Sequence, residues 1–314
     1  MAFAFVFPGQ GSQSIGMLSA LAGTEPLVLE TFGEASEALG YDLWKLCQEG
    51  PEELLGTTER TQPAMLAAGV ATWRVWRKHG GALPQAMSGH SLGEYSALVA
   101  AEALDFKTAV KLVQFRGQAM QAAVPAGQGA MAAILGSTDA DVEAACSEAA
   151  QGEIVQAANY NSPGQVVIAG HATAVDRAIE VLKAKGAKRA IKLPVSVPSH
   201  SALMAPAAEQ LRQRLSEIEI NSPKVQDIYT VDVRKHGDAV AIREALVQQL
   251  VKPVRWTETI QAMLSSGIKV IVECGPGRVL TGLNRRIEKS KDVAMLAIED
   301  AESLQQALEA CRGK

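Results

Sequence analysis

The order of apolar and polar positions along the chain predicts short buried strands separated by longer helices. The apolar runs Phe3–Phe7 and Ala86–Met87 are strand-like, whereas residues 27–39, 62–78 and 105–123 repeat apolar positions with helical spacing. Strands that alternate with amphipathic helices are typical of a layered α/β architecture with a largely parallel sheet. The first part of the chain is therefore predicted to form such a layered unit.

After Val124–Gly127 the order of elements changes to strand, helix, strand, strand, helix, strand. A polar turn, Asn161–Gly164, separates the two middle strands. This βαββαβ order is the split pattern of a ferredoxin-like unit. We predict a small ferredoxin-like subdomain over residues 126–195, inserted into a large α/β subdomain formed by residues 1–125 and 196–314. The strands of the insert are expected at 130–135, 154–158, 165–170 and 189–193, and its helices at 140–150 and 174–185.

The α/β alternation resumes in the last third of the chain. Helices are expected at 202–215, 239–250, 256–265 and 279–288, and strands at 228–231, 270–273 and 293–298, before a final helix.

Composition narrows the class of protein. The 314 residues are 47% hydrophobic and 20% charged, enough for one large core or two unequal ones. A net charge of -4 argues against nucleic-acid binding. The four cysteines show neither C-x-x-C nor zinc-ligand spacing, which favours a reducing compartment and predicts no metal site. No apolar stretch approaches the ~20 residues that span a bilayer, and the run from Phe3 is too short for a signal peptide. We expect a cytoplasmic protein that does not bind membranes.

The sequence Gly89-His90-Ser91-Leu92-Gly93 lies between a predicted strand and a helix expected from Glu94 to Ala103. A serine with glycine at both second neighbours is typical of a nucleophile elbow, because the sharp turn leaves no room for side chains there. The helix behind the serine directs backbone N–H groups at a developing oxyanion. Because such pentapeptides also occur by chance, other residues are needed to show whether Ser91 is a nucleophile.

A serine nucleophile needs a base, and His200 is the best placed of the five histidines. It follows a strand and precedes a helix, where α/β proteins collect their site loops. A buried structural histidine is an equal alternative from composition, and the presence of Ser91 favours a nucleophile–base pair. The other histidines are predicted to cap a helix end, to lie in solvated turns or to brace the elbow (His79; His171 and His236; His90).

A carboxylate that could orient His200 is missing from the predicted loops. The α/β-hydrolases place an acid between serine and histidine in the chain, but here the acids between them lie mostly in predicted helices (Glu94, Glu102, Asp105, Asp139). The hydrolase pattern therefore fits poorly. A neutral acceptor such as a backbone carbonyl would also orient the imidazole.

Two further features have a functional and a structural interpretation. The loop Phe7–Gln13 places two glycines around Gln10, which suits a backbone that approaches a ligand but also an ordinary Pro-Gly turn. Arg116 falls on the apolar stripe of its helix, so its charge must be paired. Its partner is either a structural carboxylate or the carboxylate of a substrate.

Together these segments resemble the malonyl-CoA:acyl carrier protein transacylases of type II fatty acid synthesis, within the acyltransferase-domain family. The resemblance covers essentially the whole chain, and its motifs occur in order: FVFPGQGSQ (5–13), TQPA (61–64), GHSLGEYSALVA (89–100), RG (116–117), GAMAAI (129–134), NSPGQVVIAG (161–170), LPVSVPSH (193–200) and GPG (275–277). Such an ordered series is far more specific than the elbow alone. It implies a hydrolase-like large subdomain with the ferredoxin-like insert.

The resemblance also implies roles for single residues. Ser91 is the nucleophile, His200 its general base, and the main-chain carbonyl of Gln249 orients the histidine. The backbone N–H groups of Gln10 and Leu92 form the oxyanion hole. Substrate contacts are implied for the side chains of Arg116, Gln10, His90 and Asn161. Of these, Arg116 is the one that binds the malonyl carboxylate.

The implied reaction moves a malonyl group from malonyl-CoA to the phosphopantetheine thiol of holo acyl carrier protein through a malonyl-serine ester, in a ping-pong sequence without cofactor or metal. The protein is expected to be a monomer, and the acidic carrier protein to dock on a basic surface. Two basic clusters are candidates: Lys183, Lys185, Lys188, Arg189 and Lys192 on the insert, and Arg278, Arg285, Arg286 and Lys289 on a late helix.

Three rival functions remain at this point. A serine esterase or thioesterase would share the elbow, but the missing acid and the buried arginine count against it. A carrier-binding module without chemistry would not need Ser91, His200 and Arg116 together. An acyltransferase of a polyketide pathway could use another acyl unit, although Leu92 and residues 197–200 look more like the malonyl-loading enzyme.

Overall fold

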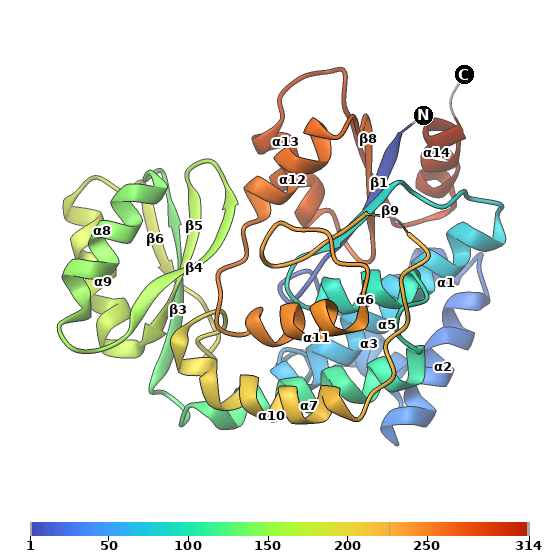
Figure 1. Ribbon diagram of the computed structural model, residues 1–314. Helices are drawn as coiled ribbons and strands as arrows, with labels where there is room; N and C mark the ends of the chain where they lie inside the picture. Colours follow the sequence, from blue (N-terminus) through green and yellow to red (C-terminus); the bar gives the residue numbers. More distant parts are fainter. Residues whose placement is uncertain (1, 226, 313–314) are drawn as a thin grey trace.

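The computed structural model describes residues 2–225 and 227–312, which form two sheets joined into a large and a small body (Figure 1). The five-stranded sheet has the order β7-β2-β1-β8-β9, and all its neighbouring strands are parallel. Its strands are β1 (Phe3–Phe7), β2 (Ala86–Gly89), β7 (Asp227–Tyr229), β8 (Val270–Cys274) and β9 (Ala294–Ile298). The predicted parallel α/β unit is confirmed.

Helices cover both faces of this sheet, so its central strands are buried on both sides. The helices of the large body are α1 (Ser19–Ala22), α2 (Leu27–Leu39), α3 (Leu43–Glu49), α4 (Glu52–Leu55), α5 (Thr58–Lys78), α6 (Gly93–Ala100), α7 (Phe106–Ala123), η1 (Ala202–Met204), α10 (Ala205–Ser216), α11 (Ala239–Gln248), α12 (Trp256–Ser265), α13 (Val279–Ile287) and α14 (Ala301–Arg312).

The alternation within β1 separates two apolar cores. Phe5 and Phe7 pack with α5 on one face, where the Phe5 ring centroid lies 4.9 Å from that of Trp76. Val6 packs on the other face with α12 and α13, beside Trp256. Successive side chains of a strand point to opposite faces, which explains this division.

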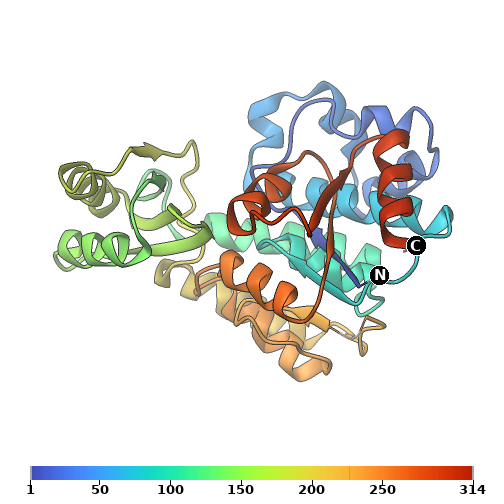
Figure 2. The same cartoon turned by 90° about the horizontal axis from the view of Figure 1, so that it is seen from above.

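The small body contains the second sheet, with the order β4-β5-β3-β6 and antiparallel pairing throughout. Its strands are β3 (Gly129–Leu135), β4 (Val155–Ser162), β5 (Gln165–His171) and β6 (Arg189–Lys192), with helices α8 (Asp139–Ala150) and α9 (Ala172–Ala184). Both helices pack on one face of the sheet, and the body extends to one side of the large one (Figures 1 and 2). The predicted ferredoxin-like order is confirmed, and on this basis we propose residues 126–195 as the small subdomain.

Several elements differ from the sequence prediction. The turn expected over Asn161–Gly164 is wrong in its first half, since β4 continues through Ser162. An added backbone bond, from Tyr160 N to Val254 O (2.8 Å), extends the pairing of this polar strand end. The helix after the elbow ends at Ala100, earlier than expected. Helices α1, α3 and α4 were not predicted because four to seven residues are too few to show helical periodicity.

Candidate active site

The elbow has the geometry that its glycines predict. β2 ends at Gly89, α6 begins at Gly93, and Ser91 between them has a left-handed backbone with φ 51°. A Cβ at Gly89 would lie 1.8 Å from the carbonyl carbon of Gly93, and one at Gly93 would lie 1.9 Å from the carbonyl oxygen of Phe7. Backbone occupies both places, so only glycine fits and the strand can turn directly into the helix.

The N-terminal loop packs backbone to backbone against this elbow. His90 N donates to Phe7 O at 2.9 Å, and a Cβ at Gly9 would lie 2.3 Å from His90 O. Among the described residues, no group accepts a hydrogen bond from the backbone N–H of Gln10 or of Leu92. Both amides are therefore available to an oxyanion, as the sequence implies.

His200 is buried, and it too has a left-handed backbone, with φ 60°. Its Nδ1 lies 2.7 Å from the carbonyl oxygen of Gln249, which can only accept, so Nδ1 carries the proton and Nε2 is left as the basic nitrogen. Burial first, and then the charge of Arg116, lowers the pKa of His200 to about 3. The imidazole is thus neutral near pH 7, as a general base requires.

Arg116, on the buried face of α7, is 1% exposed, and no carboxylate pairs with it within residues 2–225 and 227–312. Its Nη1 donates to Gln62 Oε1 (2.8 Å), and its Nη2 donates to Gln249 Oε1 (2.9 Å) and to Ser91 Oγ (3.3 Å). Burial lowers the pKa of Arg116, but arginine stays charged in proteins. The structural ion pair considered from the sequence is not the arrangement found.

These groups face one cavity of about 700 Å³ between the two bodies. His90, Ser91, Arg116 and His200 line it from the large body, and Asn161 lines it from β4. Gln10 and Leu92 of the large body and Met131 and Val167 of the small sheet also line it. The cavity therefore combines a serine, a neutral histidine and an uncompensated guanidinium.

A hydrogen bond crosses between the two bodies at this cavity. His90 Nε2 donates to Asn161 Oδ1 at 2.8 Å, and the His90 ring packs 5.5 Å from that of Trp256. Burial lowers the pKa of His90, so the ring is neutral. His90 thus connects the elbow to the small body, which fits its predicted role of bracing the elbow.

Ser91 and His200 line the same cavity, but within the described residues the hydroxyl of Ser91 is hydrogen-bonded to Arg116 rather than to His200. Bonds of this kind between a nucleophile and its base often tighten only when substrate is bound.

Sequence reasoning missed three polar groups: the side chain of Gln62, which lines the cavity, and those of Glu94 and Gln249 behind it. Gln249 Nε2 donates to Glu94 Oε2 at 2.6 Å. Burial raises the pKa of Glu94 to about 8. No hydrogen bond joins Glu94 to His200, which agrees with the poor fit of the serine–acid–histidine pattern. A polar residue just before an apolar run of a helix was the available signal, since Gln62 and Glu94 are buried near the starts of α5 and α6.

The other histidines differ in part from expectation. His79 is the C-terminal cap residue of α5, as expected, and its Nε2 lies 2.6 Å from Glu25 Oε1. The turn predicted for His171 is wrong, because His171 ends β5 and its Nδ1 accepts from Ile154 N at 2.9 Å. His236 lies in the loop after β7, with Nε2 3.1 Å from an exposed Asp232 carboxylate oxygen.

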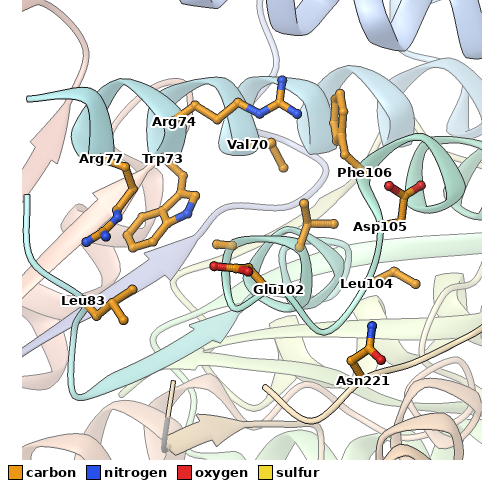
Figure 3. Close-up of a pocket in the computed structure, with 12 residues that line it drawn as sticks. Val70, Trp73, Arg74, Arg77, Leu83, Glu102, Leu104, Asp105, Phe106 and Asn221 are labelled. Atoms are coloured by element: carbon orange, nitrogen blue, oxygen red, sulfur yellow. The ribbon is translucent and has the colours of Figure 1, made fainter. Parts of the chain in front are cut away.

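A second pocket, of about 500 Å³, lies between α5 and the start of α7 (Figure 3). It contains none of the predicted site residues. Its arginines already have partners, because Arg74 forms an ion pair with Glu34 and Arg77 donates to the carbonyl oxygen of Gly81. Nothing in it provides a nucleophile next to a base.

Within residues 2–225 and 227–312, no group of three or more His, Cys, Asp or Glu side chains is placed to hold a metal ion. No helix in these ranges is long and apolar enough to span a membrane.

Comparison with known proteins gives the family. The acyl transferase domain family matches residues 4–306. A malonyl CoA-acyl carrier protein transacylase of Escherichia coli (strain K12) is 58% identical over 285 residues, which are 91% of this chain and 92% of the relative. The solved structure of such a transacylase from Coxiella burnetii is 54% identical, with a TM-score of 0.96 over 98% of this chain and 97% of that one.

Another similar structure is described as a type II PKS acyl-carrier protein in complex with its malonyl-transacylase. It is 55% identical, with a TM-score of 0.96 over 99% of this chain and all of that chain (100%).

An elbow serine on a parallel sheet, facing a ferredoxin-like insert, defines an α/β enzyme of acyl transfer. The chain belongs to the acyl transferase domain family, and the resemblance drawn from its sequence motifs is confirmed.

Proposed function

We propose that this enzyme transfers the malonyl group of malonyl-CoA to the phosphopantetheine thiol of holo acyl carrier protein, through an ester on Ser91. The observation that carries the proposal is the guanidinium of Arg116. It is buried, has no carboxylate partner among the described residues, and lies with Nη2 3.3 Å from the Ser91 hydroxyl. An acyl group that brings its own carboxylate supplies the missing charge beside the nucleophile.

In the first half-reaction, Ser91 Oγ attacks the thioester carbonyl while His200 Nε2 takes the hydroxyl proton. The amides of Gln10 and Leu92 stabilise the oxyanion of the tetrahedral intermediate. The intermediate collapses, the C–S bond breaks, and the imidazolium returns its proton to the departing coenzyme A thiolate. The product is malonyl-Ser91 with neutral His200.

In the second half-reaction, the carrier thiol gives its proton to His200 and attacks the ester carbonyl. The C–O bond to Ser91 then breaks, and the serine oxygen recovers the proton from the imidazolium. Arg116 holds the malonyl carboxylate throughout, which keeps the acyl carbonyl at the oxyanion hole. The carbonyl of Gln249 orients His200 without a negative charge, and we infer that this moderate activation favours the thiol over water.

A basic docking surface for the carrier protein is supported by how the two cationic clusters meet. Arg286 on α13 donates to the Gln165 side chain at the start of β5. Gln165 pairs across the sheet with Leu135, which pairs in turn with Arg189 on β6. Arg286 of the late helix and Arg189 of the insert therefore border the same end of the small sheet, and an acidic partner could contact both.

Not every cation of the insert is equally available to a partner. Lys183, Lys185 and Lys192 each form an ion pair with a carboxylate of the same subdomain. Lys188 and Arg189 are exposed and form no ion pair within the described part of the chain. We propose these two as part of the docking surface.

We further propose that the enzyme acts as a monomer in the cytoplasm. All four cysteines are buried free thiols, which suits a reducing compartment. Within one chain the cavity already receives side chains from both bodies, so no second copy is needed to complete it.

The test is covalent labelling. Wild type and Ser91→Ala are incubated with radiolabelled malonyl-CoA without acceptor, and the protein is separated and counted. Label on wild type alone, removed by holo carrier protein faster than by water, supports the transacylase. No label on wild type, or loss to water at the same rate with and without carrier protein, would indicate an inactive module or a hydrolase.

A further inference from the structure

Gln249 is hydrogen-bonded to several of the polar groups at and behind the cavity. It is 1% exposed, and its Nε2 donates to Ser91 O (3.0 Å) and to Glu94 Oε2 (2.6 Å). Its Oε1 accepts from Arg116 Nη2 (2.9 Å), while its backbone carbonyl accepts from His200 Nδ1 (2.7 Å). One residue thus contacts the elbow, the base and the arginine.

The orientation of this amide is determined by Glu94. Both hydrogens of Nε2 have acceptors, the carbonyl of Ser91 and the carboxyl of Glu94, so the oxygen end must face the guanidinium. If the Glu94 acceptor were removed, half of this constraint would be lost. A flipped amide would turn its N–H donors towards Arg116 and leave a guanidinium donor without an acceptor.

The same arrangement keeps the Glu94 carboxyl apart from the Arg116 guanidinium. The side-chain amide of Gln249 lies between Glu94 and Arg116, which are not hydrogen-bonded to each other. Two other charged groups lie near the Glu94 carboxyl. Asp232 is in the loop after β7, and Arg255, just before α12, lines the same small cavity as Glu94. Burial raises the pKa of Glu94 to about 8, so its carboxyl is mostly neutral at pH 7. Arg116 is held only by neutral oxygens, those of Gln62, Gln249 and Ser91.

We propose that the Gln249 side chain, anchored by Glu94, is a positioning residue that sets the selectivity for carboxylated acyl groups. It fixes Arg116 through a neutral oxygen and keeps the Glu94 carboxyl from pairing with the guanidinium. The positive charge of Arg116 is therefore available to bind the carboxylate of the substrate. This inference rests on the proposed function, because the selectivity concerns the acyl group loaded on Ser91.

The test is Gln249→Glu, which keeps the backbone carbonyl for His200 and nearly the same side-chain volume. It places a carboxylate against Arg116 in the position that a neutral oxygen now occupies. We expect the kcat/KM for malonyl loading to fall roughly 10- to 100-fold, the range for a charge-assisted hydrogen bond. Acetyl loading, which does not use the guanidinium, should change much less, and most of the malonyl loss should appear in KM.

The matched control is Gln248→Glu. Gln248 is the preceding residue, and its side chain forms an exposed contact with Glu244, so the same charge change occurs outside the site. It should leave the malonyl-to-acetyl ratio as in wild type. Arg116→Ala gives the reference for complete loss of the carboxylate contact.

A second pair of variants covers the case in which Gln249→Glu does not fold. Glu94→Leu removes the anchor, and Glu94→Gln supplies an amide oxygen in its place. The malonyl-to-acetyl ratio should fall in Glu94→Leu and recover, at least in part, in Glu94→Gln, with thermal unfolding confirming that both are folded. Equal losses on both substrates, or an unchanged ratio in all these variants, would overturn the inference. A wild type that forms no ester on Ser91 would instead overturn the proposed function.

Discussion

Two residues of the site have backbones that side chains rarely adopt. Ser91 and His200 are both left-handed, with φ 51° and 60°, although neither is glycine. Strain of this kind persists only where the surroundings fix the residue, and it is frequent at active sites. Here glycines at second-neighbour positions fix the serine, and the Gln249 carbonyl holds the histidine.

The low pKa of His200 predicts an unusual pH dependence. Since burial and the Arg116 charge disfavour the imidazolium, the free enzyme's base loses its neutral form only as the pH approaches about 3. The kcat/KM for malonyl loading should therefore stay level between pH 7 and 5, whereas an unperturbed imidazole of pKa about 6.5 would lose its neutral form, and with it the rate, about 25-fold. Single-turnover loading across this range, with circular dichroism to verify folding, measures it.

Arg116→Ala gives the matched comparison for this pH profile. Without the nearby positive charge the pKa of His200 rises, so the acidic decline should move to higher pH, measured with an uncharged acyl-CoA. A wild-type midpoint near pH 6.5, unmoved in the variant, would show that neither burial nor Arg116 acts on the base.

At the scale of elements, the elbow depends on contacts between backbones. The end of β2, the start of α6 and the loop after β1 approach so closely that Gly9, Gly89 and Gly93 each fill a place without room for a methyl group. The three segments therefore place the Ser91 hydroxyl and the N–H groups of Gln10 and Leu92 as one rigid unit.

Gly89→Ala tests this rigidity. The new methyl would lie 1.8 Å from backbone of Gly93, so the strand and helix must separate. We expect a loss of about 1–3 kcal/mol in the free energy of unfolding, as for other overpacked sites. Malonyl loading should fall roughly a hundredfold, since displacement of about 1 Å suffices for that. Urea titration and the labelling assay measure the two effects.

Gly282→Ala, in helix α13, is the control for Gly89→Ala. A Cβ there meets nothing within 4 Å, so the variant should be stabilised by about 0.5–1 kcal/mol and remain active. If both variants behaved alike, close backbone packing would not explain the elbow glycines.

At the scale of the whole molecule, the cavity is made by the joining of two bodies. The large body supplies Ser91, His200 and Arg116, while the small sheet supplies Asn161 and an apolar wall. The bond between His90 and Asn161 connects the two across the cavity. A partner that delivers a thiol to Ser91 must approach where both bodies are within reach, which is why the small subdomain is a candidate for docking.

The charge reversal Lys188→Glu with Arg189→Glu tests that docking. Both side chains are exposed, so folding should be unaffected, while repulsion of an acidic carrier protein should raise its KM about tenfold. Loading from malonyl-CoA should stay within twofold of wild type, since free coenzyme A does not need the surface. Separate assays of the two half-reactions distinguish these effects.

Lys45→Glu, an exposed charge reversal on α3, is the control, and added salt should lessen the effect of the double variant. An unchanged carrier KM in the double variant would exclude Lys188 and Arg189 from the docking surface.

The sequence alone determined the order of elements, the two sheets, the elbow and the family. These follow from local causes: hydrophobic periodicity, the need for glycine at sharp turns, and motifs in a fixed order. It also singled out Arg116, because a charge on an apolar helix face needs a partner. Its errors lie where local signals are weak, in the short helices α1, α3 and α4 and in the polar end of β4.

Only the tertiary structure decided which partners the buried polar groups have. The oxygens that hold Arg116 come from Gln62, Ser91 and Gln249, which are 54, 25 and 133 positions away in the chain. No local pattern predicts that Glu94 determines the orientation of the Gln249 amide, or that the Glu94 carboxyl is not bonded to the Arg116 guanidinium. Hydrogen bonds between distant segments depend on how the bodies pack, and packing is a property of the whole fold.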